Sequence, residues 1–217
     1  MPHVLTATEF SDALPPGDPV ASDARWLLDR AAAYLQSRGH YGLARPLLER
    51  ALAGEETSQG LDHPAVARRL NALALLLFDE GDPARARPLL ARAVAINEAT
   101  YGPDHPVVAN DMTNLAAVLL ELGQADQARP LLERAVTINE AAYGPDHPET
   151  ARSLRNLASI ARQTGDPALC RRLLTRALMI DEAAYGPDHP VVVASLGELA
   201  AVVHDLGEAE AALPLVL

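Results

Sequence analysis

Apolar residues recur along the chain with the period of an α-helix, in pairs of segments separated by a glycine. Before Gly81, they stand at Leu70, Leu73, Ala74 and Leu77, the i, i+3, i+4, i+7 spacing of one helical face. The segment after the glycine repeats this spacing, at Ala86, Leu90 and Ala93. The pattern predicts pairs of amphipathic helices that bury one face each.

The helix pair belongs to a sequence repeat with a period of 42 residues. Residues 101–142 and 143–184 align without a gap and share 20 identities in 42 positions. The tripeptide Asp-His-Pro returns at the same interval, beginning at Asp62, Asp104, Asp146 and Asp188. Glycines keep the same period, at Gly39, Gly81, Gly123, Gly165 and Gly207. Self-similarity at such a period indicates a stack of identical supersecondary units.

Local signals predict where each helix begins and ends. The first helix of a unit runs from about the Asp-His-Pro, where Asp or His caps it, to just before the glycine, whose position suits a positive φ. The second begins at an acidic cap followed by proline, as at Asp82-Pro83 and Asp166-Pro167. Prolines inside the second helix predict modest bends, at Pro46, Pro88, Pro130 and Pro214. We expect an N-terminal extension and Pro-rich linker (1–22) and a repeat domain (23–217) with approximate units 23–63, 64–105, 106–147, 148–189 and an incomplete 190–217.

The order Leu-x-x-Leu-Ala, then glycine, then Ala-Arg-Pro-Leu-Leu resembles the tetratricopeptide repeat. More narrowly, the 42-residue period with Tyr-Gly-Pro-Asp-His-Pro resembles the kinesin-light-chain-like subgroup of that family. The resemblance implies an all-α protein, an α-solenoid of about five stacked helix-turn-helix repeats that forms a right-handed superhelix. In that family the first helices line a concave groove that binds proteins or peptides.

Composition narrows the class of partner. The formal charge is −11, and all eighteen cations are arginines. An acidic chain with eight aromatic residues is not expected to bind nucleic acid. No apolar run reaches the length of a membrane helix, and the first twenty residues lack the features of a signal peptide, so we expect no membrane contact and a cytoplasmic location.

The candidate reactive residues are better explained by packing. Four histidines share the period, but histidines in successive units are expected to lie too far apart to bind one metal ion. Cys170 takes the place of Ala44, Ala86 and Ala128, which indicates contact between the two helices of its unit. Because no catalytic or phosphate-binding motif is present, we predict neither an enzyme nor a cofactor or metal.

The resemblance also implies which side chains face the groove. In each first helix they are the fourth, seventh, eighth, eleventh and fourteenth residues after the Asp-His-Pro proline; Thr113, for example, is a seventh residue. The polar and basic residues predicted to bind the partner are Arg68, Asn71, Asn110, Asn114, Arg152, Arg155, Asn156 and Arg162. Segment 148–189 has six arginines and five acids, whereas 106–147 has two arginines and six acids.

This local excess of arginine predicts a partner with acidic residues or a free C-terminus, because guanidinium binds carboxylate in a bidentate manner. Arg155 is expected to be exposed on the helix face, so that its removal hardly changes stability. Its removal weakens binding if Arg155 makes a charge-assisted bond to the partner, and has little effect if Arg155 only faces solvent. Self-assembly through the apolar C-terminal end at 213–217, including a homodimer, is an alternative function. The chain is alternatively one part of a longer protein, and the N-terminal extension is a candidate to occupy the groove.

Overall fold

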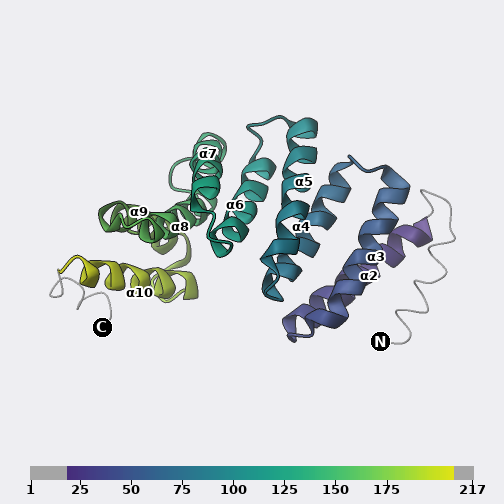
Figure 1. Ribbon diagram of the computed structural model, residues 1–217, viewed down its shortest axis with the longest axis horizontal. Coiled ribbons are helices and arrows are strands. Elements are labelled where there is room, and N and C mark those ends of the chain that lie inside the picture. Colours follow the sequence, from purple (N-terminus) through teal and green to yellow (C-terminus); the bar gives the residue numbers. More distant parts are fainter. Residues whose placement is uncertain (1–18, 208–217) are drawn as a thin grey trace. The chain divides into compact units, whose positions relative to one another are not determined.

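The computed structural model describes residues 19–207, and all regular secondary structure in this range is α-helical (Figure 1). The chain consists of two compact units, Met1–Pro103 and Asp104–Leu217, with the boundary in the loop that precedes an Asp-His-Pro. In each unit, every helix packs against the next one along the chain. The prediction of an all-α solenoid built from helix pairs is confirmed.

The first unit contains two helix pairs within the described range. Its helices are α2 (Pro19–Ser37), α3 (Tyr41–Gln59), α4 (Pro64–Asp79) and α5 (Pro83–Tyr101). Helix α2 begins four residues before the predicted domain start at residue 23, because proline fits the first turn of a helix. The preceding part of the predicted linker lies outside the described residues.

The second unit contains two helix pairs and one further first helix within the described range. Its helices are α6 (Pro106–Glu121), α7 (Ala125–Tyr143), α8 (Pro148–Gln163), α9 (Pro167–Tyr185) and α10 (Pro190–Asp205). Helix α8 contacts α6 as well as α7, so successive first helices are neighbours in this unit. Residues 208–217, which include Pro214 and the apolar end, lie outside the described part.

The periodic histidines cap the first helices, as predicted. In His147, Nδ1 accepts a hydrogen bond from the Glu149 backbone N–H at 3.2 Å, and Pro148 takes the first helical position. Equivalent caps form at His63, His105 and His189. The acidic caps of α5 and α9 are confirmed too, since Asp82 and Asp166 accept from the N–H groups of Arg85 and Leu169.

The periodic glycine ends each first helix as expected. Gly81 has a φ of 82°, a left-handed conformation that costs a residue with a Cβ atom energy, and its N–H donates to the Phe78 carbonyl. A second glycine ends each second helix, and Gly102 has a φ of 90°. The two glycines of a repeat therefore allow the chain to turn after the first helix and again after the second helix.

In each repeat, the hydrophobic core lies between the first and the second helix of the pair. In the first unit Val66, Ala67 and Leu70 of α4 pack with Ala93 and Ile96 of α5. In the second unit Cys170 is buried among apolar residues of α8, α9 and α10, which confirms its packing role. Alanine at the matching positions is fully buried, at Ala44, Ala86 and Ala128. These small side chains let the two helices of a pair approach closely.

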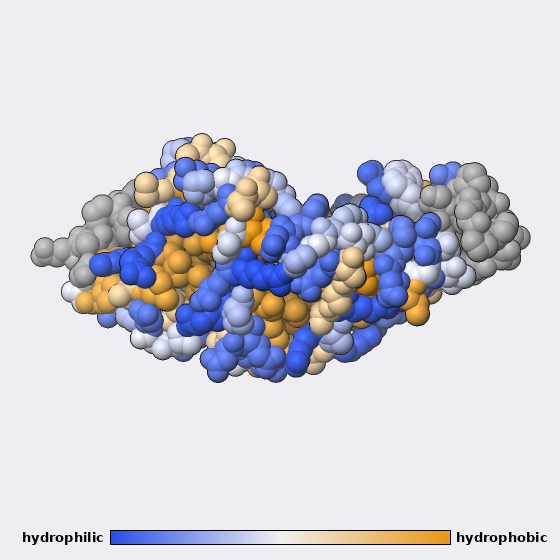
Figure 2. Space-filling view, turned by 90° about the horizontal axis from the view of Figure 1, so that it is seen from above, coloured by the Kyte–Doolittle hydropathy of each residue, from blue (hydrophilic) through white to orange (hydrophobic). Residues whose placement is uncertain are grey.

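The surface follows from this amphipathic arrangement. Figure 2 shows hydrophilic side chains interspersed with apolar surface, as expected when each helix buries only one face. None of the helices in residues 19–207 is both long and apolar enough to cross a membrane.

Candidate partner-binding site

Helices α6 and α8 bring three of the predicted partner-binding residues together in the second unit. Asn110 and Asn114 lie four residues apart on α6, and Arg152 lies on α8. A spacing of four places the two asparagines on the same side of α6, one turn apart. We call the surface that these three residues form with Glu149 the α6–α8 face.

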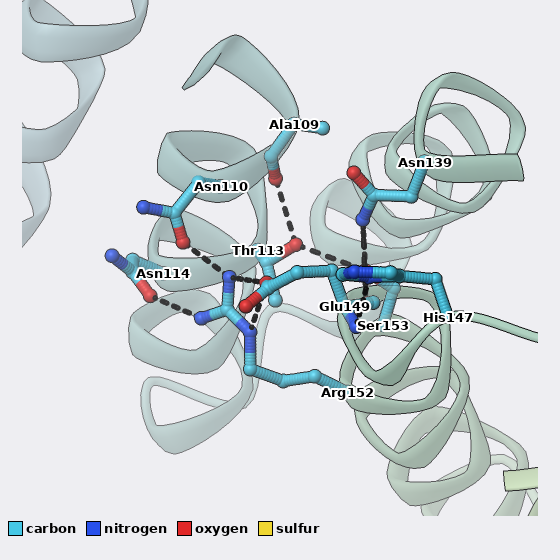
Figure 3. A network of polar contacts seen from close by, with 9 residues as sticks. All are labelled: Ala109, Asn110, Thr113, Asn114, Asn139, His147, Glu149, Arg152 and Ser153. Carbon is cyan, nitrogen blue, oxygen red and sulfur yellow. Dashed lines mark hydrogen bonds and ion pairs between the residues drawn. The ribbon is translucent and has the colours of Figure 1, made fainter. Parts of the chain in front are cut away.

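Arg152 connects the residues of this face (Figure 3). Its Nη1 donates to Asn114 Oδ1 at 3.2 Å, and its Nη2 donates to Asn110 Oδ1. On its other side, Nε donates to Glu149 Oε2 at 3.1 Å, and Nη2 lies 2.9 Å from the same oxygen. One guanidinium therefore holds two carboxamides and one carboxylate, with opposite charges in contact.

Buried hydrogen bonds beneath the face fix the positions of its helices. Thr113 Oγ1 of α6 lies 3.2 Å from Ser153 Oγ of α8. Asn139 of α7 donates to the Glu149 carbonyl at 3.3 Å and to Ser153 Oγ at 3.4 Å. Thr113 is only 1% exposed, so the expectation that it faces the groove is wrong. The seventh residue after the proline here points toward the neighbouring helices, where a hydroxyl pair satisfies it.

Arg155 occupies the same seventh position in α8, and the prediction that it faces solvent is also wrong. Its guanidinium forms an ion pair with Asp181 of α9, and its side chain is 23% exposed. The Asp181 side chain is 1% exposed. A buried carboxylate requires a compensating charge, which explains the inward orientation of Arg155. Arg155 is consequently part of the helix packing of its own unit.

The two remaining predicted residues of α8 make no such connection. Asn156 is half-buried, whereas Arg162 is exposed in the last helical turn. Neither side chain has a hydrogen-bond or ion-pair partner within residues 19–207. Arg162 lines a small hollow together with Ser159, Cys170 and Glu198. It is therefore an available cation on the same helix as Arg152.

Arg68 and Asn71 lie on α4, in the first unit, apart from the α6–α8 face. Arg68 is exposed and lines a hollow between α2 and α4 with Asp29 and Gln36. The adjacent Arg69, by contrast, pairs with Asp29 and with Glu55 at 3.3 Å. Arg68 itself has no carboxylate partner in the described part of the chain.

Sequence reasoning missed two side chains that are suited to recognition. Trp26 on α2 is 58% exposed, and the Arg30 guanidinium lies 5.3 Å from its ring centre. Trp26 precedes Arg68 by one period of 42 residues, which is the signal that could have identified it. Tyr143, 48% exposed, lines a hollow beside Asn110 with Val107 and Glu149. An aromatic side chain at such a hollow offers apolar contact to a ligand.

The reactive groups do not form a site of their own. Within residues 19–207, no three His, Cys, Asp or Glu side chains are grouped so that they could hold a metal ion. Burial raises the pKa of the Cys170 thiol, with smaller raising effects from Glu198 and Asp166 and an opposing effect from Arg162. A raised pKa disfavours the nucleophilic thiolate at neutral pH.

Comparisons with known proteins agree with this fold. The family model described as tetratricopeptide repeat matches residues 22–99, 69–141, 111–178 and 154–216. The search of curated proteins gives no match.

Several solved structures are similar. A Podosopora anserina protein described as a kinesin light chain with nearly identical TPR-like repeats is 27% identical, with a TM-score of 0.75, over 87% of this chain and 89% of that one. BtubC (BKLC) from P. vanneervenii is 19% identical, with a TM-score of 0.82, over 99% and 86%. A Rap protein complexed with competence and sporulation factor is 14% identical, with a TM-score of 0.74, over 99% and 56%. The last two likenesses show the fold alone.

Proposed function

Because the chain belongs to the tetratricopeptide repeat family, with repeats of the kinesin-light-chain-like type, we propose that it is a non-catalytic adaptor that binds a segment of a partner protein on the α6–α8 face. The cytoplasmic location predicted from the sequence is part of the proposal. The observation that carries it is the polar network around Arg152. Exposed Asn110 and half-buried Asn114 of α6 are held in fixed orientations by Arg152 of the neighbouring helix α8, which limits the side-chain entropy lost on binding.

The partner segment is proposed to bind in an extended conformation as a peptide. A carboxamide can donate and accept hydrogen bonds, so Asn156 matches the main chain of such a segment. Asn110 offers its Nδ2 as a donor, because its Oδ1 accepts from Arg152. The hollow beside Asn110, with the exposed ring of Tyr143, provides space for a partner side chain. Main-chain recognition with one or two side-chain contacts is a common mode of peptide binding.

Acidic residues or a free C-terminus in the partner are proposed to meet Arg162 in the second unit and Arg68 in the first. Both guanidinium groups are exposed, and neither has a carboxylate partner in the described residues. We do not assign this role to Arg155, because its guanidinium pairs with Asp181. Such contacts are partly exposed, so rising salt should weaken them.

Affinity capture with the full chain as bait tests the proposal. Bound proteins from a lysate are quantified by mass spectrometry for the unaltered chain and for the double variant Asn110→Ala with Asn156→Ala. The control is Gln127→Ala, a change at an exposed polar residue of α7 that should leave capture unchanged. Partners that bind the unaltered chain and the control but not the double variant support the proposal. Equal capture by all three proteins places the binding surface elsewhere.

A homodimer through the C-terminal end is the alternative. Val193 is 58% exposed, which provides apolar surface on α10, the last helix of the described residues. Measurement of solution mass across a wide range of concentrations separates the two functions. A dimer that dissociates on Val193→Asp would favour assembly, whereas a monomer at all concentrations excludes it.

A further inference from the structure

Most hydrogen-bond donors of the Arg152 guanidinium already have partners within the protein. An arginine side chain has five N–H donors. In the structure Nε, Nη1 and Nη2 all have oxygen partners, and Nη2 contacts both Asn110 Oδ1 and Glu149 Oε2. Little donor capacity is left for a carboxylate from outside. The Glu149 carboxylate also balances the charge of Arg152 locally.

The same contacts determine the orientation of Asn110. Because guanidinium can only donate hydrogen bonds, the carboxamide atom that faces it must be the oxygen. Figure 3 shows the consequence, with the Asn110 nitrogen directed away from Arg152. Asn110 is exposed, and its Nδ2 has no acceptor among the described residues. A donor of fixed direction is thus presented at the surface, beside the hollow lined by Val107 and Tyr143.

We propose that Arg152 is a positioning residue, which orients Asn110 to donate to an uncharged main-chain carbonyl of the partner and does not itself bind the partner's acidic groups. The inference rests on the proposed peptide-binding function and deepens it. The two arginines of α8 then have different roles in binding the partner. Arg162 supplies a cation to acidic groups, while Arg152 serves the neutral contact made by α6.

Two variants separate a positioning role from direct binding of acids. Arg152→Lys keeps the charge but lacks the planar fork that reaches Glu149 and both asparagines. Arg152→Gln removes the charge as well. If Arg152 positions Asn110, both changes should free the Asn110 carboxamide. If Arg152 instead binds the partner's acidic groups directly, the lysine variant should retain much of the affinity for the partner, because it keeps the positive charge.

The first measurement needs no ligand. The ¹H–¹⁵N heteronuclear NOE of side-chain amides reports their motion on the picosecond to nanosecond timescale. Asn110 is expected to give a high value in the unaltered protein and a low one in both Arg152 variants. Asn156 is the internal comparison, because its carboxamide makes no hydrogen bond with Arg152 in the structure and its value should not change. An Asn110 value that is unaffected by both variants overturns the positioning role.

The second measurement uses an uncharged probe, the capped peptide acetyl-Thr-Ser-Thr-Ser-Thr-Ser-amide, titrated against the full chain. It is expected to shift the Asn110 side-chain amide signals of the unaltered chain. The Kd, measured by calorimetry for all proteins, should be about three- to tenfold weaker in both Arg152 variants and in Asn110→Ala, the range of one hydrogen bond. If the peptide does not shift these signals, or binds the Arg152 variants as well as the unaltered chain, the inference is wrong. If the Asn110 NOE falls in both Arg152 variants as expected but no partner is captured from lysate, the adaptor function alone is contradicted.

Discussion

Replacement of Arg155 by alanine should destabilise the protein, although the residue lies at a position that the family pattern assigns to the groove. The change leaves Asp181 without its counter-charge. The Asp181 side chain is 1% exposed and its Oδ1 has no hydrogen-bond partner in the described residues, so water cannot readily replace the guanidinium. The expected loss therefore comes mainly from an uncompensated buried carboxylate.

Its magnitude follows from measured cases of broken buried ion pairs. Removal of one partner costs about 3–5 kcal/mol. The Arg155 side chain is 23% exposed, which admits some solvent after truncation, so we expect the lower end, about 3 kcal/mol. For a chain of this length, that loss corresponds to a decrease in Tm of about 6–12 °C.

The repeat provides a specific rescue. Position 181 corresponds to Asn139, which donates to the Glu149 carbonyl and to Ser153 Oγ. One period after Ser153, the Ser195 hydroxyl is buried and has no hydrogen-bond partner in residues 19–207. Asp181→Asn should supply the missing donor and remove the buried charge. The double variant should therefore lie within about 1 kcal/mol of the unaltered protein.

Thermal unfolding followed by circular dichroism at 222 nm checks the four proteins of this cycle. Arg162→Ala is the matched control, because Arg162 is an exposed arginine of the same helix and its loss should cost less than about 0.5 kcal/mol. If Arg155→Ala melts within 1–2 °C of the control, or if Asp181→Asn does not rescue it, then the ion pair is not what makes Arg155 important.

Four further outcomes are expected. His147→Ala should lose about 1 kcal/mol of unfolding free energy because the Glu149 N–H loses its acceptor, while His147→Asp should retain most of it, as denaturation by urea can show. Cys170 should react with iodoacetamide far more slowly in the folded than in the unfolded protein. Because the folded state favours the protonated thiol, Cys170 contributes stability at pH values below the pKa of the thiol in the unfolded chain. This contribution should decline as the pH rises above that value. The pH dependence should be absent in Cys170→Ala. Zinc or a chelator should leave the Tm unchanged, and a rise of several degrees with zinc would show that the histidines form a metal site.

The sequence by itself determined the helices, their ends and their order in the repeat. These features depend on local interactions, such as the His147 cap and the positive φ of Gly81, and on an apolar period that each helix carries within its own residues. The same reasoning identified the small residue at Cys170 as a contact between helices. The 42-residue period extended each local assignment to the remaining units.

Only the tertiary structure decided what the polar residues of the first helices do. Asn110 and Arg152 are 42 residues apart in sequence, and their contact exists because α6 and α8 are neighbours. Arg155 was predicted to face solvent because its helical position is that of a groove residue, yet the carboxylate of Asp181 on α9 draws it inward. Whether a charged side chain binds a partner or an internal counter-charge depends on which groups surround it after packing, and helical periodicity carries no information about the neighbouring helix.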